Sequence, residues 1–252
     1  MHRLPGILLD LTARGHHALN VRLFDCGSYL RFYQELITRV LCRPGYVLHL
    51  GSGDATTLSR EMELSSAKSR FVCLDTDLQS MRKNPARLKV VADAVALPFK
   101  DDIFQAVCSE HLLEHLSNPA DVFRESRRVL LNGGHFFFAA PNGWSYIALL
   151  ARMVPLRFHA ALVSFGVHAE GEHRHFPTYY RANSVFSIRR LAKSSRLSVE
   201  RLEGFVGEPC YTLSLPVVHL IAIAWHKLLE SVGLHLWCGL TLIGVLTKRE
   251  AE

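Results

Sequence analysis

The sequence predicts an α/β fold built on a doubly wound, mostly parallel sheet. Five short apolar runs of strand-like composition lie between residues 46 and 141, and helical or turn segments separate them. Such alternation gives parallel strands whose connections cross over as helices on both faces of the sheet. A parallel sheet of this kind binds ligands at the carboxyl ends of its strands.

The expected elements follow one another in a regular order. An amphipathic helix within residues 19–42 ends at the turn of Arg43, Pro44 and Gly45. The expected strands are YVLHL (46–50), RFVCLD (70–75), LKVVAD (88–93), IFQAVCS (103–109) and GHFFFAAP (134–141). Further helices are expected from Thr56 to about Leu64, from Leu78, and across EHLLEHL (110–116) and PADVFRESRRVLL (119–131).

The C-terminal part of the sequence is less regular. A helix is expected at 181–196, a strand at 197–205 and a last strand within 237–250. Apolar segments cover residues 144–167 and 213–232, but polar residues interrupt both. Neither reaches the ~18–20 uninterrupted apolar residues of a membrane-spanning helix, so we expect them to cover a substrate pocket or to rest on a membrane surface.

Composition and charge narrow the class of protein. The six cysteines show neither a C-x-x-C pair nor zinc-finger spacing, which favours reduced core residues over disulfides. Pro5 and Asp10 leave the first apolar stretch too short for a signal peptide, so a cytoplasmic protein is expected. Lys and Arg exceed Asp and Glu by 29 to 23, but they are dispersed, which favours a solvated basic face over a specific nucleic-acid site.

Residues suited to ligand binding follow the first two expected strands. Gly51, Ser52 and Gly53 come after the first strand, where missing side chains let the backbone approach a ligand at a helix N-terminus. Asp75 ends the second strand 24 residues past Gly51, about where an acid takes the two hydroxyls of a ribose, and Thr76 follows it.

The next two strand ends carry similar residues. Asp93 and Ala94 follow the third strand, where a carboxylate and a neighbouring N–H suit the edge of an adenine, and Ser109 ends the fourth. An aspartate at one strand end is more often a turn or capping residue than a ligand. Four such sites at successive strand ends predict a bound nucleoside.

Four segments together resemble a known family. YVLHLGSGDAT, FVCLDTD, VVADAVALPFKDDIFQAVCSEHLLEHLSNP and ESRRVLLNGGHFFFAAPN resemble the successive motifs of the class I S-adenosylmethionine-dependent methyltransferases. The subgroup suggested is the small-molecule enzymes typified by those of ubiquinone and menaquinone biosynthesis. The resemblance covers residues 46–142.

The resemblance implies a fold and a cofactor. The fold is a Rossmann-like, doubly wound, seven-stranded sheet of order 3-2-1-4-5-7-6 with the last strand antiparallel, here with helical insertions in the C-terminal half. The cofactor is S-adenosylmethionine. Its methionine part is expected beside the loop of His49, Gly51, Ser52 and Gly53, while Asp75 holds the ribose and Asp93 contacts the adenine.

A three-part organisation of one methyltransferase domain follows from these expectations. Residues 1–45 form an N-terminal helical cap, and residues 46–142 form the cofactor-binding half. Residues 143–252 form the substrate-side half, with apolar helical insertions and the final strands.

The sequence also departs from the family pattern. His49 replaces the usual Asp of the first motif, Ala55 the third glycine, Gln105 an Asp and Asn132 a Pro. With an ordinary pKa near 6.5, His49 is mostly neutral at pH 7 and cannot fully replace a carboxylate near the ammonium group of the cofactor. A non-catalytic relative with a degenerate cofactor loop therefore remains an alternative.

An NAD(P)-binding oxidoreductase is a second alternative. Gly51, Gly53 and Asp75 loosely fit the dinucleotide fingerprint. The third glycine of that fingerprint falls at Thr56, and no second mononucleotide half is visible. The methyltransferase therefore remains the leading hypothesis.

Catalytic residues are harder to predict. Methyl transfer depends mainly on alignment of two reactants, which contributes roughly 7–11 kcal/mol, and a base is needed only if the acceptor must lose a proton. The candidates are His111 after the fourth strand and His175, or its neighbour His173, in the loop EHRHF. The acceptor is expected to be a small or lipid-linked molecule, and the apolar segments and basic charge suggest contact with a membrane surface. No oligomeric state is predicted.

The stretch HLLEH (111–115) matches the H-x-x-E-H pattern of inverted zinc peptidases. That alternative leaves Gly51, Asp75 and Asp93 unexplained, and no metal site is predicted. The family resemblance adds a weaker hypothesis, because the ubiquinone O-methyltransferases carry a similar cluster linked to a divalent metal; here it would comprise Glu110, Glu114 and His115.

Overall fold

The computed structural model of the protein describes residues 28–41, 44–54, 69–153, 177–207 and 216–250. The chain divides into two compact units, each assembled from separate stretches of sequence. Among the described residues, the larger unit holds 30–41, 44–54, 69–141, 177–203 and 242–250, and the smaller one holds the rest.

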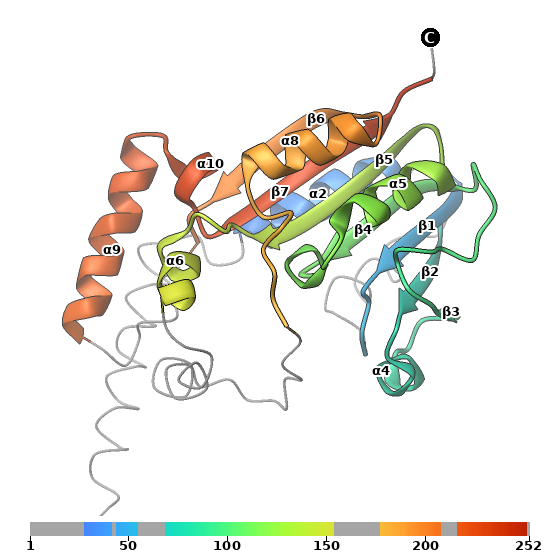
Figure 1. The fold of residues 1–252 in the computed structure, drawn as a ribbon, viewed down its shortest axis with the longest axis horizontal. Helices are drawn as coiled ribbons and strands as arrows, with labels where there is room; N and C mark the ends of the chain where they lie inside the picture. Colours follow the sequence, from blue (N-terminus) through green and yellow to red (C-terminus); the bar gives the residue numbers. More distant parts are fainter. Residues whose placement is uncertain (1–27, 42–43, 55–68, 154–176, 208–215, 251–252) are drawn as a thin grey trace, which may run out of the picture. The chain divides into compact units, whose positions relative to one another are not determined.

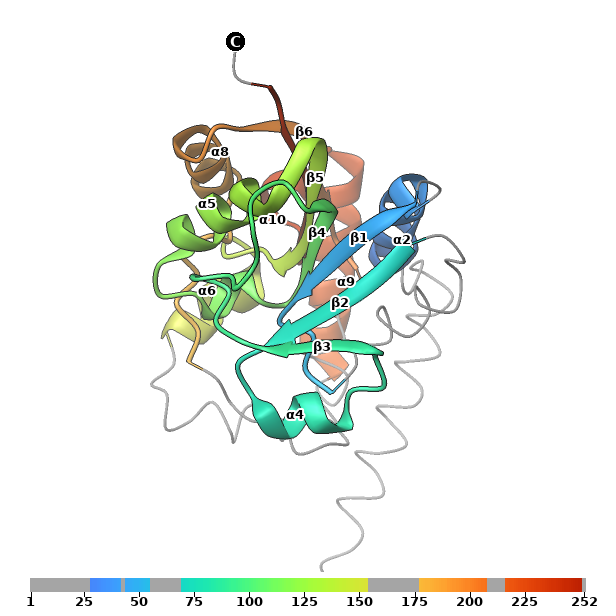
Figure 2. The same ribbon diagram turned by 90° about the vertical axis from the view of Figure 1, so that its right-hand side faces the viewer.

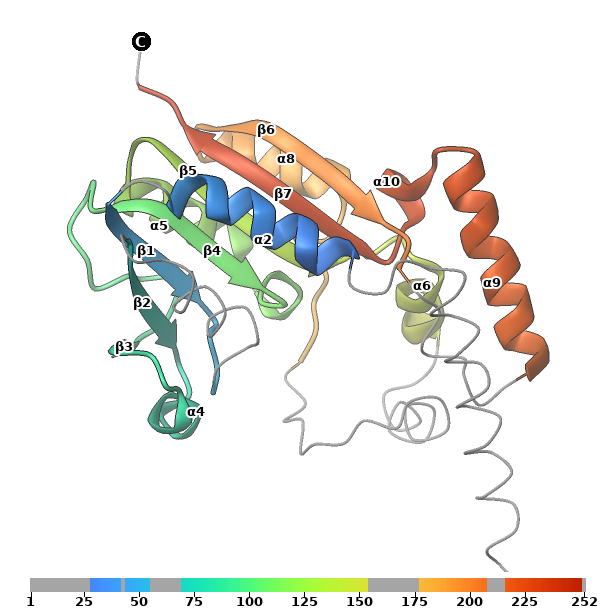
Figure 3. The ribbon, with the colours of Figure 1, turned by 180° about the vertical axis from the view of Figure 1, so that it is seen from behind.

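A seven-stranded sheet dominates the larger unit, in the order β3-β2-β1-β4-β5-β7-β6 (Figure 1). Its strands are β1 (Gly45–Leu50), β2 (Ser69–Asp75), β3 (Leu88–Val91), β4 (Phe104–Glu110), β5 (Leu130–Pro141), β6 (Leu197–Phe205) and β7 (Thr241–Lys248). Strands β1 to β5 pair in parallel, and β7 runs against its neighbours (Figure 3). The predicted strand order is therefore confirmed.

Helices cover both faces of this sheet. Helix α2 (Ser28–Leu41) lies on one face, while α5 (Pro119–Val129) and α8 (Val185–Ser194) lie on the other (Figures 1 and 3). Helix α4 (Leu78–Lys83) follows the carboxyl end of β2 (Figure 2). The predicted helix of residues 56–64 lies outside the described residues.

Local sequence explains where the two main covering helices begin and end. Ser184 and Ser187 form a capping box at the start of α8. Pro119 occupies the first turn of α5, and the buried residues of that helix recur with helical spacing. Helix α5 ends two residues earlier than predicted, because Leu130 is extended and pairs with Phe104 at the start of β5.

The core lies between the sheet and helices α5 and α8. Leu48 and Leu50 of β1 and Phe136 of β5 pack there with Phe123 of α5, whose ring lies edge-on to that of Phe136 at 5.5 Å. Burying each such side chain contributes roughly 1.5–3 kcal/mol. Parallel strands covered on both faces carry the continuous apolar runs that the sequence shows.

The smaller unit contains helices α6 (Tyr146–Met153), α9 (Pro216–Ser231) and α10 (His235–Cys238). The Tyr146 ring lies 5.5 Å from that of His226, and the Asn142 amide donates to the Trp237 carbonyl at 2.9 Å. Parts of both apolar segments are thus helical, as expected for insertions. None of the helices among the described residues is long and apolar enough to cross a membrane.

One predicted helix is wrong. Across EHLLEHL only Leu113–His115 (η1) is helical, as a single 3-10 turn. His111 has a φ of +53°, in the left-handed region that an α-helix does not contain, so the chain turns sharply after β4 instead of continuing as a helix.

Candidate functional site

The candidate site begins with the glycine loop after β1. Gly51 and Gly53 have φ values of +67° and +54°, which other residues adopt only with strain. The Gly51 and Ser52 N–H groups both donate to the Leu74 carbonyl of β2, at 2.8 and 3.1 Å. A Cβ built on Gly53 would meet no atom of the described residues within 4 Å.

Asp75 at the end of β2 holds this loop in place. Its Oδ2 accepts the Gly53 N–H and its Oδ1 accepts the Asp77 N–H, both at 2.9 Å. A carboxylate offers about four acceptor positions, so the half-buried Asp75 can accept about two more hydrogen bonds. The exposed Thr76 lies next to it in sequence. Asp75 can therefore order the loop and bind a diol at the same time.

Two buried polar side chains support the loop from within. The Asn84 amide donates to the Gly53 carbonyl at 2.9 Å and lies 3.5 Å from Ser52 Oγ. Ser52 itself is fully buried, and its hydroxyl also lies 3.5 Å from the Met81 sulfur. Ser52 thus contributes its backbone and its packing at this site. Asn84 was not predicted, because no local motif links it to a loop about thirty residues earlier.

Asp93 and Ala94 form a turn after β3. The Val95 N–H donates to Asp93 Oδ1 at 3.1 Å, and the Ala96 N–H donates to the Asp93 carbonyl at 3.1 Å. The Asp93 side chain is exposed and Ala94 is buried. Among the described residues the Asp93 carboxylate accepts its hydrogen bond on Oδ1, so Oδ2 can accept one from a ligand.

His49 lies inside the sheet, two residues before the loop. Its side chain is only 1% exposed, and its strand neighbours are Cys73 and Cys108. Burial lowers the pKa of His49 from 6.5 to about 4. The imidazole is therefore neutral at pH 7, more completely than its ordinary pKa predicts, and it brings no charge to the site.

Ser109 lies near the end of β4, and its carbonyl is hydrogen-bonded by α2, the helix on the sheet face opposite to α5 and α8. The buried Tyr33 hydroxyl donates to the Ser109 carbonyl at 2.8 Å and lies 3.4 Å from the Phe137 carbonyl. Burial raises the pKa of Tyr33 well above its usual value, so it remains a donor. The buried Ser109 Oγ has no hydrogen-bond partner among the described residues. Tyr33 was predicted only as part of an amphipathic helix.

The turn after β4 brings two carboxylates close to His111. The His111 Nδ1 lies 3.4 Å from Oε1 of the buried Glu114, and His115 Nε2 lies 4.0 Å from the same oxygen. Burial works against the imidazolium, but the contact with Glu114 and the charge of Glu110 outweigh it and raise the pKa of His111. Burial also raises the pKa of Glu110. His111 is half-exposed and can take up a proton from a ligand.

The zinc-peptidase alternative requires both histidines on one face of an α-helix. Here His111 itself has a left-handed φ and His115 lies in a single 3-10 turn, so the two histidines do not share an α-helix. Within the described part of the chain, no group of three or more His, Cys, Asp or Glu side chains is arranged to hold a metal ion. His173 and His175 lie outside the described residues.

The known proteins that this chain resembles are methyltransferases. Residues 48–138 match the family model described as "Methyltransferase domain". The demethylmenaquinone methyltransferase of Mycobacterium tuberculosis is 32% identical over 135 residues, which cover 49% of this chain and 56% of that protein. The malonyl-[acyl-carrier protein] O-methyltransferase of Geobacter sulfurreducens is 26% identical over 129 residues, 46% of this chain and 48% of the relative. The chain thus spans about half the length of these relatives.

A solved structure extends the likeness in fold. The geranyl diphosphate C-methyltransferase of Streptomyces coelicolor, solved with Mg²⁺, geranyl diphosphate and S-adenosyl-L-homocysteine, matches with a TM-score of 0.55 at 15% identity. The match covers 85% of this chain and 79% of that one. At this identity the match shows a common fold.

Proposed function

We propose that this chain is a class I S-adenosylmethionine-dependent methyltransferase that transfers a methyl group from that cofactor to a small-molecule or lipid-linked acceptor. One observation carries the proposal. The glycine loop, Asp75, Asp93 and Ser109 lie at one edge of the sheet, within the residues that match the methyltransferase family.

The residues at this edge fit the nucleoside part of the cofactor. Asp75 retains acceptor positions for ribose hydroxyls, and Asp93 retains one carboxylate oxygen beside the Ala94 N–H. No other described residue comes within 4 Å of the place that a side chain on Gly53 would take. The buried Ser109 hydroxyl, which has no described partner, is a further polar group at this edge.

The fit is weaker at the amino-acid end of the cofactor, where His49 is neutral. The cofactor supplies an electrophilic methyl group on a sulfonium sulfur. If the methyl acceptor must lose a proton, His111 can take up that proton. Glu114 then orients the imidazole and stabilises its charged form. An acceptor without such a proton needs only alignment.

We propose further that the methyl acceptor is apolar and that the protein contacts a membrane surface. Helix α9 supports it, because its outer face is apolar and its two charged residues, Lys227 and Glu230, pair with each other at 2.8 Å. The exposed side chains on that face are Val217, Val218, Leu220, Ile221, Trp225 and Leu228. An apolar helix face can enter the boundary between lipid headgroups and acyl chains, where the binding strength grows with the apolar area buried. We also propose a cytoplasmic location, a proposal that rests on composition and is supported by the free thiols of Cys73 and Cys108.

Calorimetric titration of the full chain with S-adenosylhomocysteine tests the proposed function. The parent chain and Asp101→Ala, a matched change at the opposite edge of the sheet, should bind it, while Asp75→Ala should bind at least tenfold more weakly, because charged hydrogen bonds contribute about 1.5–3 kcal/mol each. Binding of NAD(P)H instead would favour an oxidoreductase. If the parent chain binds neither S-adenosylhomocysteine nor NAD(P)H, the remaining hypothesis is a non-catalytic relative of the methyltransferases.

A further inference from the structure

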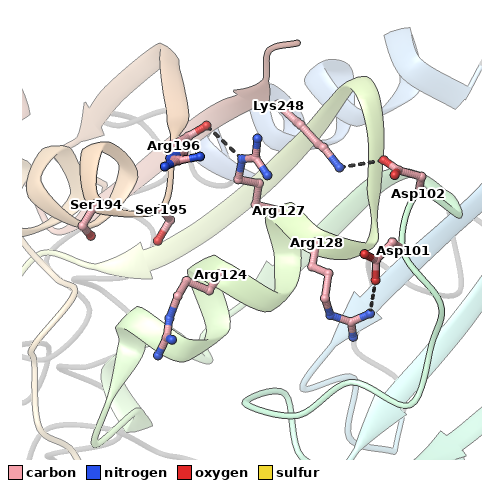
Figure 4. A pocket seen from close by; sticks show the side chains of 9 residues that line it. All are labelled: Asp101, Asp102, Arg124, Arg127, Arg128, Ser194, Ser195, Arg196 and Lys248. Atoms are coloured by element: carbon pink, nitrogen blue, oxygen red, sulfur yellow. Dashed lines mark hydrogen bonds and ion pairs between the residues drawn. The ribbon is translucent and has the colours of Figure 1, made fainter. Parts of the chain in front are cut away.

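A second pocket lies at the opposite edge of the same sheet (Figure 4). Its volume is about 370 Å³. Asp101 and Asp102 precede β4, and Lys248 ends the antiparallel β7, so all three lie at the amino ends of the parallel strands. The remaining lining residues come from the C-terminal half of α5 and the end of α8: Arg124, Arg127, Arg128, Ser194, Ser195 and Arg196. The pocket is therefore separate from the site of Gly51 and Asp75.

Three cations and both carboxylates of this pocket are already engaged, and the first of these cations, Arg124, pairs with Asp121 of its own helix. Arg128 donates to Asp101 at 2.8 Å and to Glu125 at 2.7 Å, and Lys248 donates to Asp102 at 2.6 Å. Lys248 is almost fully buried. These pairs fix one wall of the pocket and leave its carboxylates neutralised.

Arg127 and Arg196 remain without an acidic partner among the described residues. Arg127 donates only its Nε–H, to the Arg196 carbonyl at 3.3 Å, and the two residues lie next to each other where α5 and α8 end (Figure 4). Cations are common at helix C-termini, since they offset the carbonyl charge there. The hydrogen bond to the Arg196 carbonyl uses one of the five N–H donors of the Arg127 guanidinium and leaves the other four for a ligand or solvent.

A buried hydroxyl lies in the same pocket. Ser195 is 4% exposed, and its Oγ has no hydrogen-bond partner within the described part of the chain. A buried hydroxyl without a partner costs about 1–3 kcal/mol unless a ligand or water satisfies it. The pocket thus combines unpaired guanidinium groups with an unsatisfied hydroxyl.

We propose that this pocket binds a small ligand through a phosphomonoester or diphosphate group. Guanidinium groups match phosphate oxygens with paired N–H donors, and the Ser195 hydroxyl can donate to the same group. The volume lies at the lower end of the range of about 300–1,000 Å³ for small-molecule sites. The charges are gathered in one hollow rather than along a stripe, which favours a compact anion over a nucleic acid.

Calorimetric titration of the full chain with inorganic pyrophosphate tests this site. Arg127→Gln/Arg196→Gln should bind at least about tenfold more weakly than the parent. Arg190→Gln is the matched control, because Arg190 is an exposed α8 residue that does not line the pocket, and it should bind like the parent. All three should bind S-adenosylhomocysteine equally, which separates this site from the proposed function. If the double variant loses its fold, Arg196→Gln alone carries the test, since Arg196 is exposed.

The source of the phosphate is distinguished with vesicles of phosphatidylcholine and phosphatidic acid. If Arg196→Gln, which removes one charge as Arg190→Gln does, binds them less than Arg190→Gln, the ligand is a lipid headgroup. If the two bind alike and pyrophosphate still depends on the pocket, the ligand is a soluble phosphate compound. Binding that is absent, or that does not depend on Arg127 and Arg196 in either arm, would overturn the proposal.

Discussion

The Asp75 carboxylate accepts the N–H of Gly53 at 2.9 Å, which joins the acid at the end of β2 to the glycine loop of β1. Two motifs that are separated in the sequence are therefore one structural unit. A change in either motif is expected to disturb the other, and the buried Asn84 behind the loop adds to this coupling.

Asp75→Asn tests this coupling. An amide keeps one acceptor oxygen but presents an NH₂ group to one of the two N–H donors, so either the Gly53 or the Asp77 N–H loses its partner. We expect unfolding free energy to fall by about 1–3 kcal/mol and S-adenosylhomocysteine affinity to fall with it. Urea unfolding and calorimetry measure the two effects. Asp101→Asn, at the opposite edge, should leave S-adenosylhomocysteine affinity within error. Because Asp101 is 67% exposed, loss of its pair with Arg128 should lower the unfolding free energy by no more than about 1 kcal/mol. If Asp75→Asn changes neither value, Asp75 has no structural role in the loop.

His49→Asp restores the acid of the family pattern at a position that is 1% exposed. A buried carboxylate without a partner costs roughly 3–5 kcal/mol, so the cofactor-free variant should be less stable than the parent. A bound ammonium group would offset part of this cost. We therefore expect S-adenosylmethionine to raise the melting temperature of His49→Asp more than that of the neutral control His49→Asn. Equal shifts in the two variants would mean that position 49 does not face the ammonium group.

The pH dependence of stability provides a second test of His49. Its pKa is 6.5 unfolded and about 4 folded, so below pH 6.5 the unfolded chain binds the proton more readily. Stability should therefore be full above pH 6.5 and be lost as the pH falls toward 4, by about 3 kcal/mol in total at 1.36 kcal/mol per unit. Burial lowers the pKa of His226 too, which adds loss in the same direction. Urea unfolding at pH 7.5 and pH 5 should show a smaller loss for His49→Asn than for the parent.

Much of this site follows from sequence because strand ends are local features. The alternation of apolar runs predicts β1 to β5, and the acids and glycines after them fall at one edge of the sheet. The supports of the site depend on distant contacts that no local pattern encodes. Asn84 under the loop, Tyr33 on the Ser109 carbonyl and the depressed pKa of His49 arise only when separate elements pack together. The turn at His111 was missed because a left-handed residue other than glycine leaves no clear signal in sequence.

Glu114 should control the protonation of His111. Its contact with the imidazole contributes to raising the pKa of His111, so a general base at this position becomes active only as the pH rises through that raised value. Glu114→Gln removes the charge and should lower the pKa of His111, which shifts the acidic limb of the pH–rate profile to lower pH. NMR titration of the His111 ring measures the same shift without an acceptor. The same change at the exposed Glu200, Glu200→Gln, should leave the titration of His111 unchanged. If Glu114→Gln also leaves the pKa of His111 unchanged, Glu114 does not control the protonation of His111.

Helix α9 should determine binding to lipid vesicles. Ile221 and Trp225 are 64% and 41% exposed, so Ile221→Ser/Trp225→Ser removes apolar surface with little cost to folding. Each side chain contributes roughly 1.5–3 kcal/mol when it enters an apolar phase, so co-sedimentation with phosphatidylcholine vesicles should weaken at least about tenfold. Phe186→Ser, which removes a 65% exposed ring from α8, is the matched control and should sediment like the parent. If the α9 variant and this control bind vesicles equally, the apolar face of α9 does not contact lipid, and its exposed side chains must serve another surface.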